Sequence, residues 1–312
     1  MEYFLLIIGF ALLAFSGDLL VRGSVGLANR FHISSLVIGM TVVSFGTSAP
    51  ELFVSAIAAI NGSSDIAVAN VIGSNISNIG LVLGITAMLF PLLIDKNTVK
   101  IYWPVMMLAS LAFIAIAWNY EINRLEGFCF ISTFILFIFL LLRLSKKTIK
   151  LEGEVPSNIK IHIKSVRKTV ILIILGCAGL VLGAHLLVDS AITIAKYFNL
   201  SERIIGVSII AFGTSLPELA TSCMAAFRKQ AEISVGNLIG SNIFNILAIV
   251  GITAIIKPIT NIDYSILHND ILWMIGISVL LFPLLIFGKY ISRFKGIILI
   301  IASMIYYYLV LK

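Results

Sequence analysis

Long apolar runs recur along the whole chain, and they constrain its fold more than any other feature. A run of about 18 or more apolar residues can cross the hydrocarbon core of a membrane as one helix. The 312 residues are 60% hydrophobic and only 12% charged, whereas soluble domains are about 25% charged. This composition excludes a pair of soluble domains, a disordered chain and a disulfide scaffold. We therefore expect an all-α integral membrane protein.

The polarity pattern predicts ten membrane spans. They cover residues 3–26, 34–60, 65–92, 101–119, 125–144, 169–196, 203–228, 232–257, 269–288 and 294–311. The longest polar stretch is 145–168, and eight Lys and Arg residues lie between Arg143 and Lys168. Cytoplasmic loops carry an excess of Lys and Arg, so we expect this linker in the cytoplasm and both termini outside. Nucleic-acid binding is the weaker interpretation of such a patch in a membrane protein.

The chain contains an internal repeat. Val37–Leu92 aligns without a gap to Ile204–Ile259, at an offset of 167 residues, with 27 identities in 56 positions. The sequence therefore predicts two five-helix units, 1–144 and 169–312, joined by the basic linker 145–168. Because five is odd, the second unit enters the membrane from the opposite side. Such inverted repeats are typical of secondary transporters, whose binding sites lie where the repeats meet.

The two copies match best in their most polar parts. FGTSAPE (Phe45–Glu51) pairs with FGTSLPE (Phe212–Glu218), and IGSNISN (Ile72–Asn78) pairs with IGSNIFN (Ile239–Asn245). All four motifs lie within predicted spans, where polar groups are costly and usually functional. A purely structural role for two buried carboxyl groups is the weaker alternative.

The spacing of these motifs predicts a cluster of oxygen atoms. Pro50 and Pro217 should interrupt their helices and free the carbonyls of the preceding turn. Ser48 and Ser215 precede the glutamates by three residues, so each should share a helix face with the glutamate of its own copy. The serine and the last asparagine of each second motif are likewise four residues apart. Asn75 and Asn242 add two amides if they turn inward.

Hard oxygen ligands of this kind suit Ca²⁺ and Na⁺. The motifs hold no His or Cys cluster for zinc or copper. Two carboxylates neutralise one Ca²⁺, whereas two bare carboxylates in lipid would be strongly destabilising. The site must therefore always load Ca²⁺, Na⁺ or protons, which favours exchange over passive leakage.

The paired GTSxPE and GSNxxN motifs on duplicated five-helix units resemble the α-repeats of the sodium/calcium exchanger family, prokaryotic-type members of the calcium/cation antiporter superfamily. The resemblance covers essentially the whole chain. It implies ten helices, a site formed by the second, third, seventh and eighth spans, and alternating access by sliding of the first and sixth spans.

By position, the resemblance assigns Ca²⁺ to Glu51 and Glu218 with the carbonyls of Thr47 and Thr214. It assigns Na⁺ to a wider group of residues: Ser44, Ser48, Ser74, Asn78, Ala211, Ser215, Ser241 and Asn245. Some relatives have Asp at the position of Asn245. In the family this Asp accompanies potassium dependence, so the resemblance implies potassium-independent transport here. The equivalent residues Asp18 and His185, in the first and sixth spans, fit an interfacial polar role better than a gate.

The expected function is an antiporter that expels Ca²⁺ with inward Na⁺, in a prokaryotic inner or plasma membrane. The alternative is a Ca²⁺/H⁺ antiporter that uses the same two glutamates. A channel usually builds its filter by oligomeric symmetry, and an enzyme would need a base that the motifs lack. We expect no cofactor beyond the transported ions, and no partner other than the bilayer.

Overall fold

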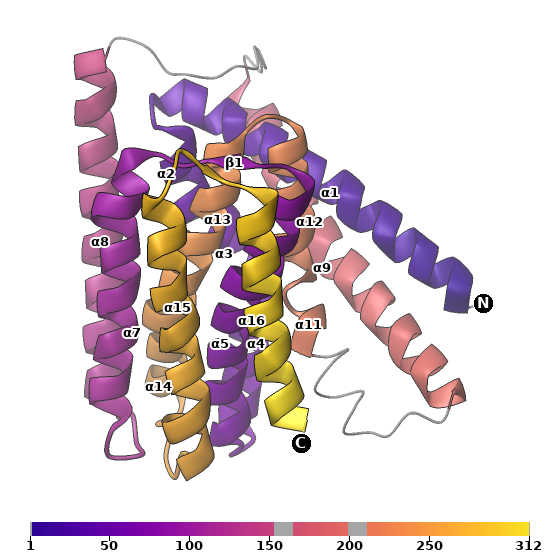
Figure 1. Ribbon diagram of the computed structural model, residues 1–312, viewed down its shortest axis with the longest axis vertical. Helices are drawn as coiled ribbons and strands as arrows, with labels where there is room; N and C mark the ends of the chain where they lie inside the picture. The colour runs from indigo at the N-terminus through magenta and orange to yellow at the C-terminus, as the bar shows by residue number, and fades with distance from the viewer. Residues whose placement is uncertain (1, 153–164, 199–210, 312) are drawn as a thin grey trace.

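The computed structural model describes residues 2–152, 165–198 and 211–311, and these residues are almost entirely helical (Figure 1). Most helices stand side by side in one bundle, and two long helices, α1 and α9, lean out of it together. In the labels, α marks an α-helix, η a π-helical segment and β a strand. The elements of the first half are α1 (Glu2–Phe31), α2 (Ser35–Ile38), η1 (Gly39–Val43), α3 (Ser44–Thr47), α4 (Ala49–Ile60), α5 (Ser64–Ser77), η2 (Asn78–Leu83), α6 (Gly84–Leu89), β1 (Leu92–Leu93), η3 (Thr98–Tyr102), α7 (Trp103–Ala117) and α8 (Arg124–Glu152).

The described helices of the second half follow the same order, whereas its strand comes after α15 rather than before η6. Its elements are α9 (Val166–Tyr197), α11 (Ala211–Gly213), α12 (Leu216–Phe227), α13 (Ala231–Phe244), η5 (Asn245–Val250), α14 (Gly251–Ile256), η6 (Ile266–Asp270), α15 (Ile271–Ile286), β2 (Tyr290–Ile291) and α16 (Arg293–Leu311). Within the described residues, eight helical stretches could each cross a membrane, and a bent pair supplies a ninth. The predicted span 203–228 begins outside the described residues, and α12 forms its second part.

The GSNxxN motifs lie on the two most buried of these stretches. In the most apolar part of Ser64–Leu89, 78% of the residues are buried inside the protein, and in that of Ala231–Ile256, 83% are. The other six stretches bury only 17–33% of theirs, because lipid covers their outer faces. The two central stretches therefore form the core that carries the GSNxxN motifs.

The predicted span 34–60 is a broken helix. It divides at Ser48 into Ser35–Thr47 and Ala49–Ile60, which meet at a bend of 48°. Pro50 stands in the first turn of α4, and Pro217 holds the same place in α12. A proline has no N–H to donate and its ring clashes with the preceding turn, so the helix restarts there, as the sequence predicted.

Two short β pairings reveal the inverted relation of the halves. β1 pairs antiparallel with β2, with Leu92 opposite Ile291. Ile122 forms an isolated antiparallel bridge with Ile259. Leu92 and Ile259 are equivalent in the repeat, yet the spanning helix α7 separates β1 from Ile122. Equivalent segments thus lie at opposite ends of the bundle, as inverted repeats require.

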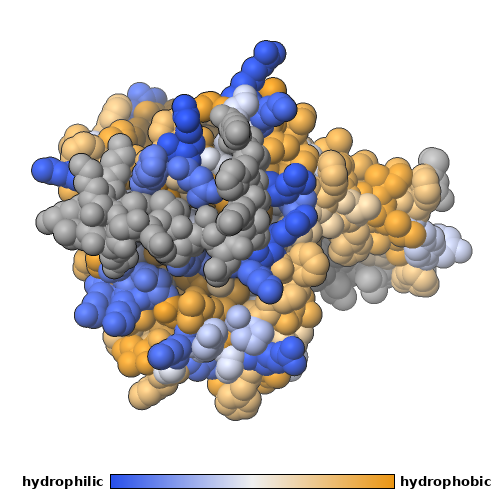
Figure 2. All heavy atoms as spheres, turned by 90° about the horizontal axis from the view of Figure 1, so that it is seen from above, coloured by the Kyte–Doolittle hydropathy of each residue, from blue (hydrophilic) through white to orange (hydrophobic). Residues whose placement is uncertain are grey.

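One end of the bundle is hydrophilic. Figure 2 looks down on the β1–β2 end, where hydrophilic side chains gather, while the flanks and the protruding helices are hydrophobic. Exposed Lys96, Lys229 and Lys289 lie in the loops that join α6 to η3, α12 to α13 and α15 to β2. The loops predicted to face the same side of the membrane therefore do lie together.

The predicted fifth span, 125–144, agrees with the apolar stretch Arg124–Ser145, but its helix is longer than the span. α8 continues to Glu152 rather than ending at residue 144, so the first part of the expected linker 145–168 is helical, and α9 already starts at Val166. The segment 145–152 contains no glycine or proline, whereas Gly153 and Pro156 follow it, and Lys and Leu are good helix formers. Residues 153–164 of the linker lie outside the described part.

Candidate functional site

The two motif glutamates are fully buried and come from opposite repeats. Glu51 lies in the first turn of α4 and Glu218 in the first turn of α12, and both have an exposed fraction of 0%. α3, which leads directly into α4, packs against α12, so the two glutamates lie on neighbouring elements. Among the described residues, neither oxygen of Glu51, nor Oε2 of Glu218, has a hydrogen-bond partner. A buried carboxylate without partners is strongly destabilised, so this pair is suited to receive a cation or protons.

Ser48 connects the two copies directly. Its Oγ donates a hydrogen bond of 2.8 Å to Oε1 of Glu218. Ser48 is the N-cap of α4, and its carbonyl accepts from the Leu52 N–H at 3.2 Å, so it keeps its place one turn before Glu51. Its hydroxyl nevertheless bonds the glutamate of the other copy rather than that of its own. Ser215, the equivalent residue, is also fully buried, and its Oγ has no partner among the described residues.

Two asparagines outside the predicted set of ligands support the broken helices. Asn237 donates to Ser222 Oγ at 3.1 Å and accepts from Thr47 Oγ1 at 3.1 Å. Its repeat equivalent, Asn70, donates to Ser55 Oγ at 2.9 Å and to the carbonyl of Glu51 at 3.1 Å. Their identity at the 167-residue offset was the available signal.

The GSNxxN motifs bring four amides together across the repeats. Asn78 Nδ2 donates to Asn242 Oδ1 at 3.2 Å, and Asn245 Nδ2 donates to Asn75 Oδ1 at 3.2 Å. The π-helices η2 and η5 begin at Asn78 and Asn245, and π-helical turns occur often at functional sites. Both asparagines are 0% exposed, and their Oδ1 atoms have no partner among the described residues.

The other predicted ligands lie on the same elements. Ser74 and Ser241 are buried on α5 and α13, one turn before the amides Asn78 and Asn245. Ser44 is buried at the start of α3, and its Oγ donates to the carbonyl of Gly39 at 2.7 Å. The last two predicted ligands, Ala211 and Thr214, lie at the start of α11 and in the turn before α12.

Glycine allows the broken helix and α13 to approach each other closely. A Cβ atom on Gly236 would lie 2.4 Å from the carbonyl oxygen of Leu36, and one on Gly240 would lie 2.5 Å from Cα of Met40. No side chain fits at such distances, so glycine at both positions brings the GSNxxN motif of the second repeat against the GTSxPE segment of the first.

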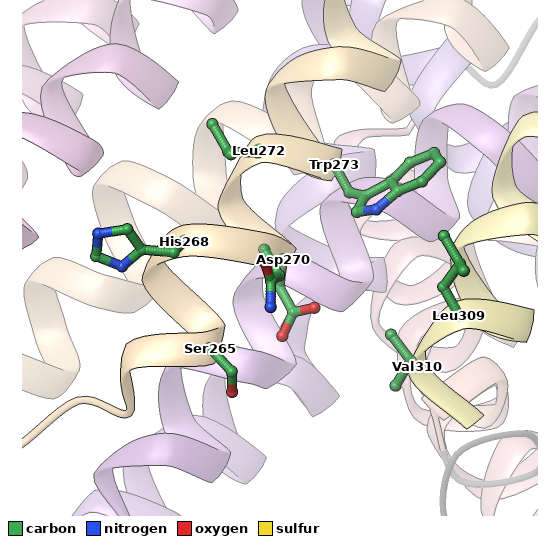
Figure 3. Close-up of a pocket in the computed structure, with 8 residues that line it drawn as sticks. Ser265, His268, Asp270, Leu272, Trp273, Leu309 and Val310 are labelled. Atoms are coloured by element: carbon green, nitrogen blue, oxygen red, sulfur yellow. The ribbon is translucent and has the colours of Figure 1, made fainter. Parts of the chain in front are cut away.

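A separate cavity of about 540 Å³ opens at the other end of the bundle. Figure 3 shows Leu309 and Val310 of α16 facing Asp270 and Trp273, with Ser265 and His268 nearby on η6 and the turn before it. Its lining contains neither motif glutamate. This cavity is therefore distinct from the paired carboxylates, which remain the candidate site.

The sequence and fold match known exchangers over nearly the whole chain. The family model described as sodium/calcium exchanger protein matches residues 1–143 and 168–312. The chain is 38% identical over 313 residues to the putative antiporter CaxA of Alkalimonas amylolytica, covering 97% of this chain and 96% of the relative. It is 30% identical over 334 residues to the sodium/calcium exchanger MaX1 of Methanosarcina acetivorans, covering 96% and 95%.

The solved structure of the sodium-calcium exchanger NCX_Mj, soaked with 10 mM Na⁺ and zero Ca²⁺, has a similar fold. The TM-score is 0.82 at 32% sequence identity, over 97% of each chain. The family match covers both halves, and the fold is that of a membrane exchanger. The chain therefore belongs to the sodium/calcium exchanger family.

Proposed function

We propose that this protein is a secondary antiporter that exchanges Ca²⁺ for Na⁺ by alternating access and has no catalytic activity. The observation that carries the proposal is the pair of fully buried carboxylates, Glu51 and Glu218, contributed by inverted repeats. The Ser48 hydroxyl donates to Glu218, and the segments that begin at Asn78 and Asn245 pack against α12 and α4. Ca²⁺ takes about 6–8 oxygen ligands. Two negative charges balance one Ca²⁺, whereas Na⁺ can use the same oxygens singly.

The burial of the site supports coupled exchange. Both glutamates are 0% exposed, so an ion must lose its water to reach them, and a carboxylate left without an ion is costly in this environment. A loaded site can therefore change sides more readily than an empty one. That asymmetry couples the movement of one ion to the return of the other.

We further propose that transport expels Ca²⁺ and is independent of potassium. Both copies carry a neutral asparagine, Asn78 or Asn245, at the last motif position. The neutral amides leave two carboxylates as the only acidic side chains of the four motifs, which limits the charge available for an additional K⁺. The basic end of the molecule, with Lys96, Lys229 and Lys289, would face the cytoplasm.

A Ca²⁺/H⁺ antiporter is the second candidate. Three of the four glutamate oxygens have no hydrogen-bond partner among the described residues, so protons could neutralise the carboxylates in place of Na⁺. In this mechanism, the hydroxyl and amide oxygens would serve Ca²⁺ alone.

Flux through purified protein in liposomes separates these functions. We expect ⁴⁵Ca²⁺ uptake to require Na⁺ inside the vesicles, to be unaffected by K⁺, and to persist when a protonophore collapses the pH gradient. Uptake that needs no Na⁺ and follows the proton gradient would establish the second candidate instead.

The glutamates themselves provide the test of the site. Glu51→Gln and Glu218→Gln should each abolish Ca²⁺ exchange, because each removes one of the two charges that balance the ion. Glu121→Gln, at an exposed position outside the spans, is the control and should retain full flux. Normal Ca²⁺ exchange by either motif variant would contradict the site under both antiporter functions.

A further inference from the structure

Two buried methionines contact the cross-repeat amides. Met106 on α7 is 1% exposed and Met274 on α15 is 0% exposed. The sulfur of Met106 lies 3.6 Å from Nδ2 of Asn242, and the sulfur of Met274 lies 3.6 Å from Nδ2 of Asn75. The methionines are 168 residues apart, close to the repeat offset, although both lie beyond the segments in which the two copies align. The same contact therefore occurs twice, each time between a methionine of one repeat and an asparagine of the other.

A methionine sulfur can determine which way an amide points. The two ends of an asparagine amide have nearly the same shape, so only their partners decide which end is oxygen. A thioether has no hydrogen and can only accept. The end of Asn242 that faces Met106 is therefore its NH₂ group, and its oxygen faces away from the sulfur.

That orientation passes to the next asparagine. The oxygen of Asn242 can only accept, so Asn78 must present its NH₂ group, and the donor–acceptor distance is 3.2 Å. The remaining end of the Asn78 amide is its oxygen, which is fully buried and has no partner among the described residues. Met274, Asn75 and Asn245 form the equivalent chain of contacts with the repeats exchanged. Its last residue, Asn245, again has a buried amide oxygen without a partner among the described residues.

The free oxygens lie on elements beside the carboxylates. η2 begins at Asn78 and packs against α12, which carries Glu218. η5 begins at Asn245 and packs against α4, which carries Glu51. If either amide were reversed, two N–H donors with partial positive charge would replace the oxygen, and they would repel a cation.

We propose that Met106 and Met274 are positioning residues that act through Asn242 and Asn75 to keep the amide oxygens of Asn78 and Asn245 available to Na⁺. This inference rests on the proposed function. It explains why a thioether stands at an amide contact inside the core, where a leucine would fill a similar volume but could accept no hydrogen bond.

We call each chain of contacts, from methionine through the first asparagine to the second, a relay. Leucine substitutions of the methionines test the relay with little change in volume. In Met106→Leu and Met274→Leu, either end of the first amide can face the leucine, so the last amide is no longer fixed. We expect the Na⁺ concentration for half-maximal Ca²⁺ exchange to rise about three- to tenfold, as loss of one modest hydrogen bond predicts, with the maximal rate within about twofold. Met40→Leu, at a buried methionine outside the relay, should leave both values unchanged.

A double-mutant cycle provides a measurement that a general packing defect would not move. A carboxylate has an oxygen at both ends, so Asn78→Asp places an oxygen against the oxygen of Asn242, which Met106 holds in place. With Met106→Leu, Asn242 can turn and donate instead. Asn78→Asp should therefore raise the half-maximal Na⁺ concentration at least threefold less in the Met106→Leu background than in the wild-type background. The pair Met106→Leu and Asn245→Asp should be additive.

The outcomes separate the relay from the proposed function. Wild-type protein that shows no Na⁺-driven Ca²⁺ flux would contradict the function. Normal wild-type flux with an unchanged half-maximal Na⁺ concentration in both leucine variants would overturn the relay alone. An equal rise in Met40→Leu, or additivity between residues 106 and 78, would also overturn it.

Discussion

At the scale of single residues, the two copies of the site differ although their motifs match. Ser48 donates to Glu218 across the repeats at 2.8 Å, whereas Ser215, its equivalent, has a buried hydroxyl without a partner among the described residues. The inverted repeats therefore place equivalent side chains in different surroundings.

This asymmetry predicts unequal effects on stability in the absence of ions. Ser48→Ala removes the hydrogen bond to a buried carboxylate and should cost about 1.5–3 kcal/mol, whereas Ser215→Ala should cost less because no hydrogen bond is lost. Thermal unfolding of the detergent-solubilised protein in Na⁺-free and Ca²⁺-free buffer measures the difference. Equal melting temperatures for the two variants would contradict the asymmetry.

At the scale of elements, α1 and α9 pack together through glycines. A Cβ atom on Gly176 would lie 2.7 Å from the backbone nitrogen of Leu20, and one on Gly183 would lie 3.1 Å from that of Leu13. Close backbone contact of this kind is typical of membrane helix pairs. The two helices that lean out of the bundle in Figure 1 therefore form one packed unit.

A single methyl group should disturb this unit. Gly176→Ala places Cβ against backbone that cannot move aside easily, so we expect a loss of about 1–3 kcal/mol and slower Ca²⁺ exchange. Gly276→Ala on α15 is the matched control, because no atom of the described residues would lie within 4 Å of a Cβ atom there, and alanine favours helix by up to about 1 kcal/mol. Melting temperature and flux should both fall only in the first variant.

An ion pair ties α1 to the end of α12. Asp18 lies in the middle of α1 rather than near its end, and its side chain is 14% exposed. Its Oδ1 accepts from Arg228 Nη2 at 2.7 Å and from Arg228 Nε at 2.8 Å. His185, its repeat equivalent, instead pairs with Asp189 on its own helix, and both side chains are more than half exposed. Among the described residues, this ion pair therefore joins only the first repeat's long helix to α12.

Charge reversal tests this connection. Asp18→Arg places a third cation beside Arg22 and Arg228 and should lower stability by about 1 kcal/mol or more. The double variant Asp18→Arg with Arg228→Asp should recover part of the loss, because Arg22 still faces the new arginine. Asp189→Arg, at the exposed counterpart, should have little effect on the melting temperature. Failure of the double variant to recover would show that the ion pair itself does not hold α1.

At the scale of the whole molecule, inversion requires that equivalent loops face opposite sides of the membrane. Asn61 follows α4, and Lys229 lies one residue beyond the equivalent position after α12; both are exposed. In a variant without the three native cysteines, a membrane-impermeant maleimide applied to intact cells should label Asn61→Cys. It should label Lys229→Cys only after the membrane is permeabilised. Labelling of both positions from outside would contradict the inverted arrangement.

Much of the architecture follows from the sequence because lipid permits so few solutions. Backbone groups in the hydrocarbon core must be satisfied within helices, so apolar runs reveal the spans, and the duplicated motifs reveal their pairing. Pro50 and Pro217 determine where the helices break, whatever surrounds them. The helix α8 runs past the predicted span 125–144 because polar residues after the membrane boundary can continue a helix, and polarity marks the boundary rather than the helix end.

The sequence by itself determined the inverted repeats, the broken helices and the burial of Glu51 and Glu218, since each depends on local composition or on a constant offset. Only the tertiary structure decided the partners of these groups: Ser48 with Glu218, Asn78 with Asn242 and Asn245 with Asn75, and Asp18 with Arg228. The members of each pair are more than 160 residues apart in the chain. Their contact depends on how the helices are rotated and shifted against one another, and neither periodicity nor motif spacing encodes that packing.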